Sequence, residues 1–204
     1  MDESDVPTFF IDKDNPHLGG HILGGDPWTK YPTLWSAMVG YYNEKKIIDI
    51  GCGEGYSTTH FKSLGVDVIG IEGTLQQDKP YIVQHDYTKG YFEHLTENDY
   101  TGYMIEFVEH LEERYLAFLS GTLLHCKTIY MTHASPGQGG YHHVNCRDSE
   151  YWKGFMIAIG FEFDMEQTRQ TRAIALSDTP WHPEWNHYAR SGMVFHRVKG
   201  LEGL

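Results

Sequence analysis

The fold of this 204-residue chain is decided by the stretch Lys46-Ile47-Ile48-Asp49-Ile50-Gly51-Cys52-Gly53-Glu54-Gly55. A short apolar run, typical of a buried strand, leads directly into alternating glycines, and residues 56–64 then have the pattern of a helix that ends at Gly65. Glycines at such a turn let the backbone bend sharply and let a ligand approach without a Cβ in the way. The stretch predicts a ligand-binding turn at the edge of a sheet, with a turn that binds nothing as the alternative.

An acidic residue at the end of the next predicted strand strengthens this interpretation. That strand covers residues 66–71, and Glu72 follows it, 19 residues after Gly53. A carboxylate about 20 residues beyond the glycines can accept hydrogen bonds from both hydroxyls of a ribose. The glycine spacing is G-x-G-x-G rather than G-x-G-x-x-G, and Asp49 and Glu54 would repel a pyrophosphate. The acids suit a cationic ligand with an amino-acid end.

Short apolar runs separated by helix-sized intervals extend the pattern along the chain. Further strands are predicted at 81–83, 103–105 and 127–131. Helices are predicted at 31–42, 108–119 and 148–159. Two more strands, at 172–176 and 193–198, have no helix-length apolar run between them and predict an antiparallel hairpin. The expected fold class is α/β: a Rossmann-like seven-stranded sheet with helices on both faces and a C-terminal antiparallel hairpin.

A single domain over residues 1–204 is expected, because no internal repeat, low-complexity tract or linker interrupts the chain. Its length and its 40% hydrophobic content suit one core, and two domains would be cramped. The domain divides into an N-terminal cap and helix segment (1–45), a β/α core (46–161) and the C-terminal hairpin (162–204).

The composition excludes several classes of protein. A formal charge of −12 disfavours non-specific binding to a nucleic-acid backbone. A membrane span is not expected either, because the sequence lacks a run of about 18 apolar residues. The acidic residues 1–5 are unlike a signal peptide. Three scattered cysteines, Cys52, Cys126 and Cys146, do not suit a disulfide framework and fit a reducing compartment. We expect a cytoplasmic enzyme, in the host cytoplasm if the chain is viral, and the sequence does not indicate an oligomeric state.

A second cluster of reactive side chains follows the fourth predicted strand, in Ile105-Glu106-Phe107-Val108-Glu109-His110-Leu111. Positions i, i+3 and i+4 share one face where the backbone becomes helical. Glu106, Glu109 and His110 therefore predict a metal site or an acid–base cluster. A solvated helix start, at which the helix dipole favours acids, is the alternative.

A histidine-rich loop follows the fifth predicted strand, and its glycines and proline between 136 and 140 predict a shaped loop rather than a helix. His133, His142 and His143 can each titrate near neutrality and act as a general base. The loop lies at the carboxyl end of the predicted sheet, where α/β enzymes bind ligands.

With these motifs in this order, the core from Lys46 to about Phe161 resembles the class I S-adenosylmethionine (SAM)-dependent methyltransferases. The resemblance implies that Glu72 holds the SAM ribose and that Asp86, just after the third strand, accepts from the adenine amino group; for Asp86 a plain turn role is the alternative. It also implies that the methionine side of SAM is lined by Asp49, Gly51, Gly53 and Gly55.

The fuller Glu-x-x-Glu-His pattern looks like the metal-binding motif of ubiquinone-biosynthesis O-methyltransferases and of small-RNA 3′-terminal 2′-O-methyltransferases. The second group adds a histidine from after the fifth strand, for which His143 is our choice and His142 the competitor. The resemblance implies a divalent cation (Mg²⁺, Mn²⁺, Fe²⁺ or Zn²⁺) held by Glu106, Glu109, His110 and His143. Without a metal, one of these histidines would act alone as the base.

Several short stretches together are similar to uncharacterised methyltransferase-domain proteins of phages and bacteria, which bring no substrate: Gly19-Gly20-His21, His85-Asp86-Tyr87, residues 106–110, residues 136–145 and Tyr151-Trp152. The resemblances imply a SAM-dependent methyltransferase (EC 2.1.1 class) that methylates an oxygen of a small polar metabolite or sugar. An RNA ribose 2′-O-methyltransferase and a non-catalytic SAM-binding protein are the alternatives. DNA-base methylation is disfavoured because the Asp/Asn-Pro-Pro-Tyr tetrapeptide is missing.

Aromatic residues gather in the connection between the last two predicted strands. Trp181, Trp185 and Tyr188 are expected to cover the acceptor pocket together with Trp28 and Trp35 from the N-terminal segment. Ordinary packing of the loop on the sheet is the alternative.

Overall fold

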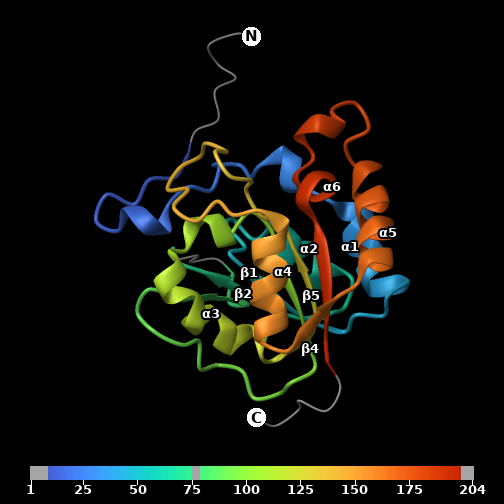
Figure 1. Cartoon of the computed structure of the whole chain (residues 1–204), viewed down its shortest axis with the longest axis horizontal. Helices are drawn as coiled ribbons and strands as arrows, with labels where there is room; N and C mark the ends of the chain where they lie inside the picture. Colours follow the sequence, from blue (N-terminus) through green and yellow to red (C-terminus); the bar gives the residue numbers. More distant parts are fainter. Residues whose placement is uncertain (1–8, 75–78, 199–204) are drawn as a thin grey trace.

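Seven strands form one mixed sheet in the order β3-β2-β1-β4-β5-β7-β6 (Figure 1). The computed structural model describes residues 9–74 and 79–198, so the acidic residues 1–5 lie outside it. The first five strands pair in parallel, and β7 runs antiparallel to both β5 and β6. The strands are β1 (Lys46–Ile50), β2 (Asp67–Glu72), β3 (Ile82–Gln84), β4 (Tyr100–Met104), β5 (Cys126–Met131), β6 (Phe161–Phe163) and β7 (Met193–Arg197).

Helices cover both faces of this sheet. They are α1 (Pro32–Gly40), α2 (Tyr56–Ser63), α3 (Leu116–Leu123), α4 (Ser149–Ala158), α5 (Met165–Leu176) and α6 (His187–Ser191). Single 3₁₀ turns lie at Pro16–Leu18, Pro27–Thr29, Val108–His110, Glu113–Tyr115 and Pro183–Trp185. Among the described residues, none of these helices is long and apolar enough to cross a lipid bilayer.

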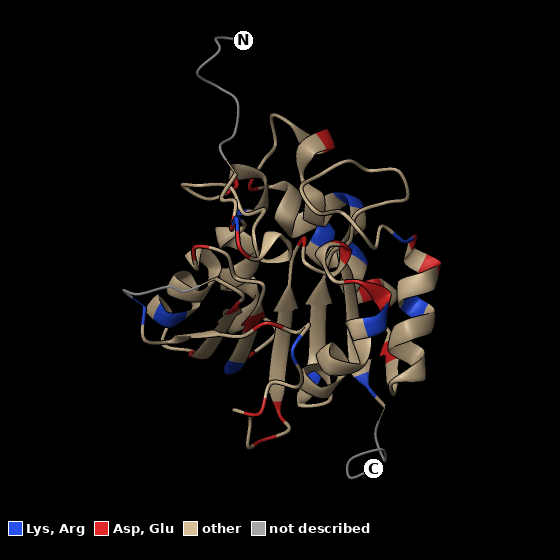
Figure 2. Cartoon of the chain, turned by 90° about the vertical axis from the view of Figure 1, so that its left-hand side faces the viewer, with Lys and Arg blue, Asp and Glu red and all other residues tan. Residues whose placement is uncertain are grey.

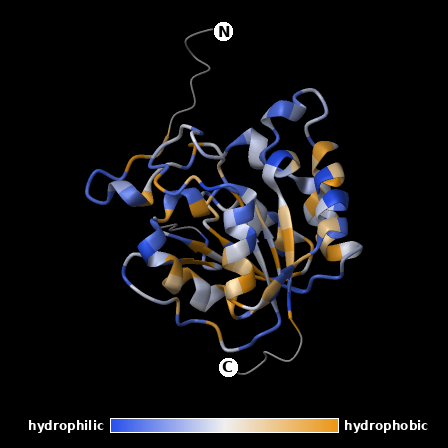
Figure 3. Ribbon diagram, in the orientation of Figure 1, coloured by the Kyte–Doolittle hydropathy of each residue, from blue (hydrophilic) through white to orange (hydrophobic). Residues whose placement is uncertain are grey.

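The alternation of side chains along β1 shows why two cores form. Ile47 packs on one face with α1, α2 and α5, whereas Ile48 and Ile50 pack on the other face with α3 and α4. Successive residues of a strand point to opposite faces, so a strand buried on both faces reads as a continuous apolar run. Figure 3 shows the hydrophobic segments concentrated in this middle layer and on the adjoining helices. The predicted fold class is confirmed.

Two predicted elements are wrong. Residues 172–176 belong to helix α5 and form no strand. The strand that pairs with β7 at the edge of the sheet is β6, at Phe161–Phe163. The helix predicted at 108–119 begins only at Leu116, because the backbone of Glu112 is extended (ψ 142°) and separates two 3₁₀ turns. That helix also continues through Gly121, where a Cβ would lie 2.6 Å from the ring of Tyr91.

The carboxyl ends of the parallel strands meet at one edge of the sheet, toward which the strand arrows point in Figure 2. β1 is flanked by β2 on one side and by β4 on the other, so the strand order reverses there. In open α/β sheets ligands bind outside the carboxyl ends of the strands at such a reversal. Residues 9–30, called the N-terminal cover below, lie over this edge (Figure 1).

Candidate active site

The glycine turn after β1 has a backbone that other residues adopt only under strain. Gly51, Gly53 and Gly55 have φ values of +70°, +53° and +72°. A Cβ on Gly51 would lie 2.3 Å from the ring of Phe107, and one on Gly55 would lie 2.4 Å from Ile82. The turn therefore requires glycine for its conformation and for its close packing.

Asp49 lies behind this turn and supports it from within the core. Its side chain is 2% exposed, and its Oδ2 accepts hydrogen bonds from the hydroxyls of Ser57 and Thr58, each at 2.6 Å. Burial raises the pKa of Asp49 to about 6, although those two hydrogen bonds act in the opposite direction. The carboxyl is thus tied to the first turn of α2, and Asp49 is not among the residues that line the cavity described next.

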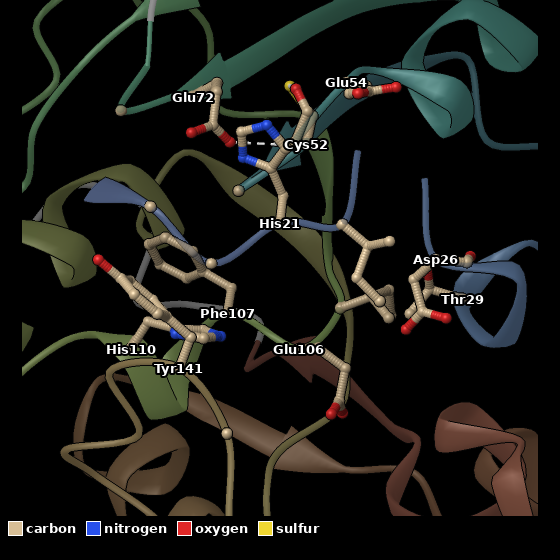
Figure 4. Close-up of a pocket in the computed structure, with 18 of the residues that line it drawn as sticks. His21, Asp26, Thr29, Cys52, Glu54, Glu72, Glu106, Phe107, His110 and Tyr141 are labelled. Atoms are coloured by element: carbon tan, nitrogen blue, oxygen red, sulfur yellow. Dashed lines mark hydrogen bonds between the residues drawn. The ribbon is translucent and has the colours of Figure 1, made fainter. Parts of the chain in front are cut away.

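A cavity of about 430 Å³ opens at the carboxyl edge of the sheet, beneath the N-terminal cover. One end is lined by the glycine turn with Glu72, and the other by Glu106, His110 and His143. Figure 4 shows Glu72 and Glu106 on opposite sides of the opening. The cavity size and its apolar walls with a few polar groups are typical of a small-molecule site.

Glu72 ends β2, and its carboxylate faces the glycine turn. Oε2 accepts a hydrogen bond from the backbone N–H of Gly53 at 2.9 Å, and Oε1 accepts from the N–H and the hydroxyl of Thr74 at 3.1 Å. The side chain lines the cavity. The carboxylate is therefore held in one orientation beside the turn.

Asp86 lines the same end of the cavity, but its oxygens have protein partners. The N–H and hydroxyl of Thr88 donate to Oδ1 at 2.8 and 2.7 Å, and His17 of the N-terminal cover contacts Oδ2 at 3.1 Å. Burial would raise the pKa of Asp86, but these contacts and Lys89 outweigh it and lower the pKa to about 2. Asp86 thus organises its own turn and fastens the cover.

The N-terminal cover contacts both ends of the cavity. The N–H of Gly24 donates to Oε1 of Glu54 at 3.0 Å, and His21 stacks on Phe10 with ring centroids 5.0 Å apart, beside Gly53. At the other end the ring of Tyr141 packs against the cover at Gly19 and Gly20. The cover closes the cavity from one side.

Three of the four expected metal ligands converge at the far end. Ligand atoms of Glu109, His110 and His143 all lie within 4.8 Å of one another. The carbonyl of Glu109 accepts hydrogen bonds from the N–H groups of Val144 and Asn145, at 2.9 and 3.0 Å. These bonds join the Glu-x-x-Glu-His segment to the loop after β5 and bring the two sequence motifs together.

Buried polar atoms of this cluster have no hydrogen-bond partner among the described residues: both carboxylate oxygens of Glu109 and Nδ1 of His110. Burial, followed by the nearby charge of Glu106, raises the pKa of Glu109 well above its ordinary value. Burial also lowers the pKa of His110 to about 4, with His143 adding to the effect. A buried, unpartnered carboxyl beside two imidazoles is either neutral or bound to a cation.

Glu106, the fourth expected ligand, has other partners. Oε1 accepts a hydrogen bond from the hydroxyl of Thr132 at 2.9 Å, and Oε2 lies 3.0 Å from Nδ1 of His187. Burial would raise the pKa of Glu106, but its interactions with His187 and Thr132 lower it overall. Glu106 is not part of the three-residue cluster.

The other two predicted histidines lie outside the cavity lining. His133 is buried, and its Nε2 lies 3.0 Å from the hydroxyl of Ser149. His142 has a left-handed backbone (φ +50°), and its ring is tilted toward that of His17 at 6.5 Å between centroids. Burial lowers the pKa of both histidines.

Sequence reasoning missed His187 and Asp26. His187 is the first residue of α6, and Asp26 belongs to the N-terminal cover, yet both line the cavity. His187 lies between the two acids, with Nε2 at 3.7 Å from Oδ2 of Asp26 and Nδ1 beside Glu106. No spacing rule connects these residues, although the cluster of aromatic residues after α5 pointed to the region.

The expected aromatic cover is present only in part. Trp28 and Trp35 line the cavity, and Trp185 packs edge-on against Trp28 with ring centroids 4.8 Å apart. Trp181 is 79% exposed, and Tyr188 is fully buried in the core with α1, α2 and α5 rather than facing a ligand.

No protein-family model matches the sequence, and no curated protein matches it, but solved structures are similar in fold. A SAM-dependent methyltransferase from Archaeoglobus fulgidus is 16% identical with a TM-score of 0.51, and the match covers 82% of this chain and 95% of that one. The plantazolicin methyltransferase BpumL, in complex with S-adenosylhomocysteine (SAH), is 14% identical with a TM-score of 0.55 and coverages of 84% and 85%.

A third similar structure is the 1,6-didemethyltoxoflavin-N1-methyltransferase of Burkholderia thailandensis, with 1,6-didemethyltoxoflavin and SAH bound. It is 12% identical with a TM-score of 0.56, and the match covers 85% of this chain and 81% of that one. The names of the second and third neighbours give different acceptors, and the identity of all three to this chain is low. The chain has the Rossmann-like fold of the class I SAM-dependent methyltransferases.

Proposed function

We propose that this protein is a SAM-dependent methyltransferase (EC 2.1.1 class) that methylates an oxygen of a small polar metabolite or sugar. The observation that carries the proposal is one cavity with two chemically different ends. The glycine turn and Glu72 form one end, and a set of carboxylates and imidazoles forms the other. Such a cavity can hold a cofactor and an acceptor side by side, and positioning of the two supplies most of the rate in a methyl transfer.

The cofactor end suits the SAM contacts implied by the resemblance. Gly53 offers an open face, since the atom nearest to an added Cβ is the Cβ of His21, 3.4 Å away. Glu72 lines the cavity beside it and has the charge to accept from ribose hydroxyls. In this proposal Gly51 and Gly55 shape the turn, Asp49 holds it from behind, and Asp86 lies at the adenine.

A divalent cation at Glu109, His110 and His143 is the second part of the proposal. The donor set of one carboxylate and two imidazoles suits Mn²⁺, Fe²⁺ or Zn²⁺ and, with added water, Mg²⁺. The unpartnered oxygens of Glu109 and Nδ1 of His110 are the atoms that such an ion would satisfy. When bound, the ion would lower the pKa of an acceptor hydroxyl. Glu106 is left out of this ligand set.

The state of the cysteines bears on the cellular compartment, and the net charge bears on the class of acceptor. All three cysteines lie in the described part of the chain and are free thiols, which supports a reducing compartment such as the cytoplasm, or the host cytoplasm if the chain is viral. The charge of −12 favours a small acceptor over RNA, because a phosphate backbone requires basic contacts.

The experiment uses SAH and SAM as probes. Calorimetry should detect SAH binding, and [methyl-³H]SAM should label catechol, glycerol, D-glucose or a component of a small-metabolite extract. The same assay includes an RNA oligonucleotide with a free 3′-terminal ribose. Label in RNA alone would favour the ribose methyltransferase. Binding of SAH without any label would favour a non-catalytic SAM-binding protein, and no SAH binding would overturn the proposal.

A further inference from the structure

We propose that His187 accepts the proton of the acceptor hydroxyl during methyl transfer, with Glu106 orienting its ring and Asp26 facing its reactive nitrogen. The inference rests on the proposed methyltransferase function. It adds a catalytic residue from a part of the chain that lies outside both sequence motifs.

The surroundings of the two ring nitrogens indicate which of them carries the hydrogen in neutral His187. Nδ1 lies 3.0 Å from Oε2 of Glu106, so the neutral ring keeps its hydrogen on that side. Nε2 then carries the free lone pair. It lies 3.7 Å from Oδ2 of Asp26, beyond hydrogen-bond distance, and all three side chains line the cavity. Because His187 lines the cavity, a hydroxyl held there can approach Nε2 from the cavity, beside Asp26.

His187 is held rigidly because both of its neighbours in the chain are anchored. Asn186 is fully buried: its Nδ2 donates to the carbonyl of Ala175 at 2.8 Å, and its Oδ1 accepts from the N–H of Ala189 at 2.7 Å. Tyr188 is also fully buried, and its N–H donates to the hydroxyl of Tyr31 at 3.1 Å. A base held this way needs little reorganisation to react.

Glu106 is held just as firmly, in a conformation that costs energy. Its φ is +49°, in the left-handed region that residues other than glycine rarely adopt. Its N–H donates to Oγ1 of Thr132 at 2.7 Å, and the same hydroxyl donates to Oε1 at 2.9 Å. Thr132 is fully buried. Strain of this kind persists where the surroundings enforce it, often at functional sites. Here it aims the carboxylate at His187.

The proton and charge balance of the step suits this arrangement. The acceptor oxygen bonds to the methyl carbon of SAM, the carbon–sulfur bond breaks, and its electron pair stays on sulfur, which gives SAH. The hydroxyl proton moves to Nε2 of His187. The positive charge of the sulfonium is thereby replaced by that of an imidazolium between Glu106 and Asp26, which are both close enough to stabilise it.

The groups that face His187 decide when it can accept a proton. Burial lowers the pKa of His187, but the hydrogen bond and charge of Glu106 and the charge of Asp26 raise it overall, against a small opposing effect of Arg190. Because the base must be neutral, turnover should rise with pH through this elevated pKa. His110 differs, since burial lowers its pKa to about 4 and it belongs to the cluster with Glu109.

The first test reads the ring directly and needs no acceptor. Histidine ring-¹⁵N NMR of the SAH-bound protein is followed from pH 5 to 9, and the His187 signals are identified by their loss in His187→Gln. We expect the neutral form to carry its hydrogen on Nδ1 and the pKa to fall in Glu106→Gln. A neutral form with its hydrogen on Nε2, or a pKa unmoved in Glu106→Gln, would overturn the assignment.

The second test compares rates with the hydroxyl probe that the wild-type protein methylates fastest. His187→Gln should reduce kcat on the order of 10²–10⁴-fold and flatten the pH profile, while SAH affinity changes little. His196→Gln is the matched control, because His196 also pairs with an acid, Asp164 at 3.3 Å, but lies outside the cavity lining. An unchanged pH profile and an unchanged kcat in His187→Gln would overturn this inference alone. Failure of the wild-type protein to bind SAH would overturn the proposed function.

Discussion

The backbone N–H of Gly53 donates a hydrogen bond to the carboxylate of Glu72 at 2.9 Å and so joins the turn after β1 to the end of β2. Gly53 follows β1 and Glu72 ends β2, and the carboxyl ends of these two adjacent parallel strands lie side by side. Through this bond Glu72 positions the glycine turn as well as lining the cavity. Loss of its charge should therefore affect the proposed cofactor site in two ways.

Replacement of Glu72 should separate these two roles. Glu72→Gln keeps an oxygen that can accept from Gly53, whereas Glu72→Ala removes the acceptor. Charge-assisted hydrogen bonds contribute about 1.5–3 kcal/mol each, so SAH affinity should fall in both variants and further in Glu72→Ala. Isothermal titration calorimetry measures the affinities. Equal SAH affinity in the wild type and both variants would show that Glu72 does not contact the ribose.

Gly53→Val should abolish SAH binding. The φ of +53° disfavours any side chain, and a branched one would occupy the open face beside His21. Gly65→Val is the matched control, because Gly65 also has a positive φ (+78°) but has open space around an added Cβ. Both variants should lose on the order of 1–2 kcal/mol of stability in thermal unfolding. Only Gly53→Val should lose SAH; comparable loss in Gly65→Val would point to strain alone.

Asp49 should make the stability of the protein depend on pH. Its pKa is raised from 3.8 to about 6 in the folded state, so folding is favoured while the carboxyl is protonated. This stability is fully present below about pH 4 and is lost as the pH rises through 6, by about 3 kcal/mol for this group alone. Asp49→Asn, which stays neutral, should remove that component in urea unfolding measured from pH 4 to 7. An unchanged pH dependence in the variant would contradict the assignment.

Metal binding should depend on Glu109. Mn²⁺ at 100 times its dissociation constant should stabilise the wild-type protein by about 2.7 kcal/mol, and EDTA should reverse the effect. Glu109→Gln should lose this stabilisation, whereas Glu113→Gln should keep it, because Glu113 forms a surface ion pair with Arg147. Since the pKa of Glu109 is raised, Mn²⁺ affinity should fall as the pH decreases. Thermal shifts and methyl transfer are both measured; full activity of the chelated enzyme would refute the metal hypothesis.

Trp185→Ala should weaken acceptor use more than cofactor binding. Trp185 supports Trp28, a cavity-lining residue, through an edge-to-face contact, and also stacks with His182 at 5.0 Å. Such contacts contribute about 0.5–1.5 kcal/mol each. The acceptor KM should rise while SAH affinity changes little, with Trp181→Ala, at a 79% exposed position, as the control. Equal losses of both, with a lower melting temperature, would indicate ordinary packing.

The sequence predicted the β1–α2–β2 unit well because its signals are local. The apolar run of β1 is buried on both faces, the glycines mark the turn, and Gly65 follows α2 with a positive φ. Helix α5 was not predicted, because its buried positions are Thr168, Thr171 and Ala175 rather than large apolar residues. A capping signal was nevertheless present, since the side chain of Asp164 accepts from the N–H of Gln167.

The candidate site was predictable where its residues share a motif. Glu109 and His110 are neighbours in sequence, and His143 lies in a loop that hydrogen-bonds to Glu109. The separation of Glu106 from this cluster could not be foreseen, because it depends on a left-handed backbone and on His187, 81 residues further along the chain. Periodicity describes one element at a time, so contacts between distant elements leave no trace in it.

The N-terminal cover affects how fast a molecule bound in the cavity can be released. A molecule held in the cavity lies beneath a segment fastened by His17 to Asp86 and by Gly24 to Glu54, and we expect these contacts to open when it leaves. Opening of such covers commonly occurs in microseconds to milliseconds and sets the turnover of many enzymes. We therefore expect a rapid first turnover followed by a slower steady state, in which the residence time of SAH, rather than the transfer of the methyl group, limits the rate.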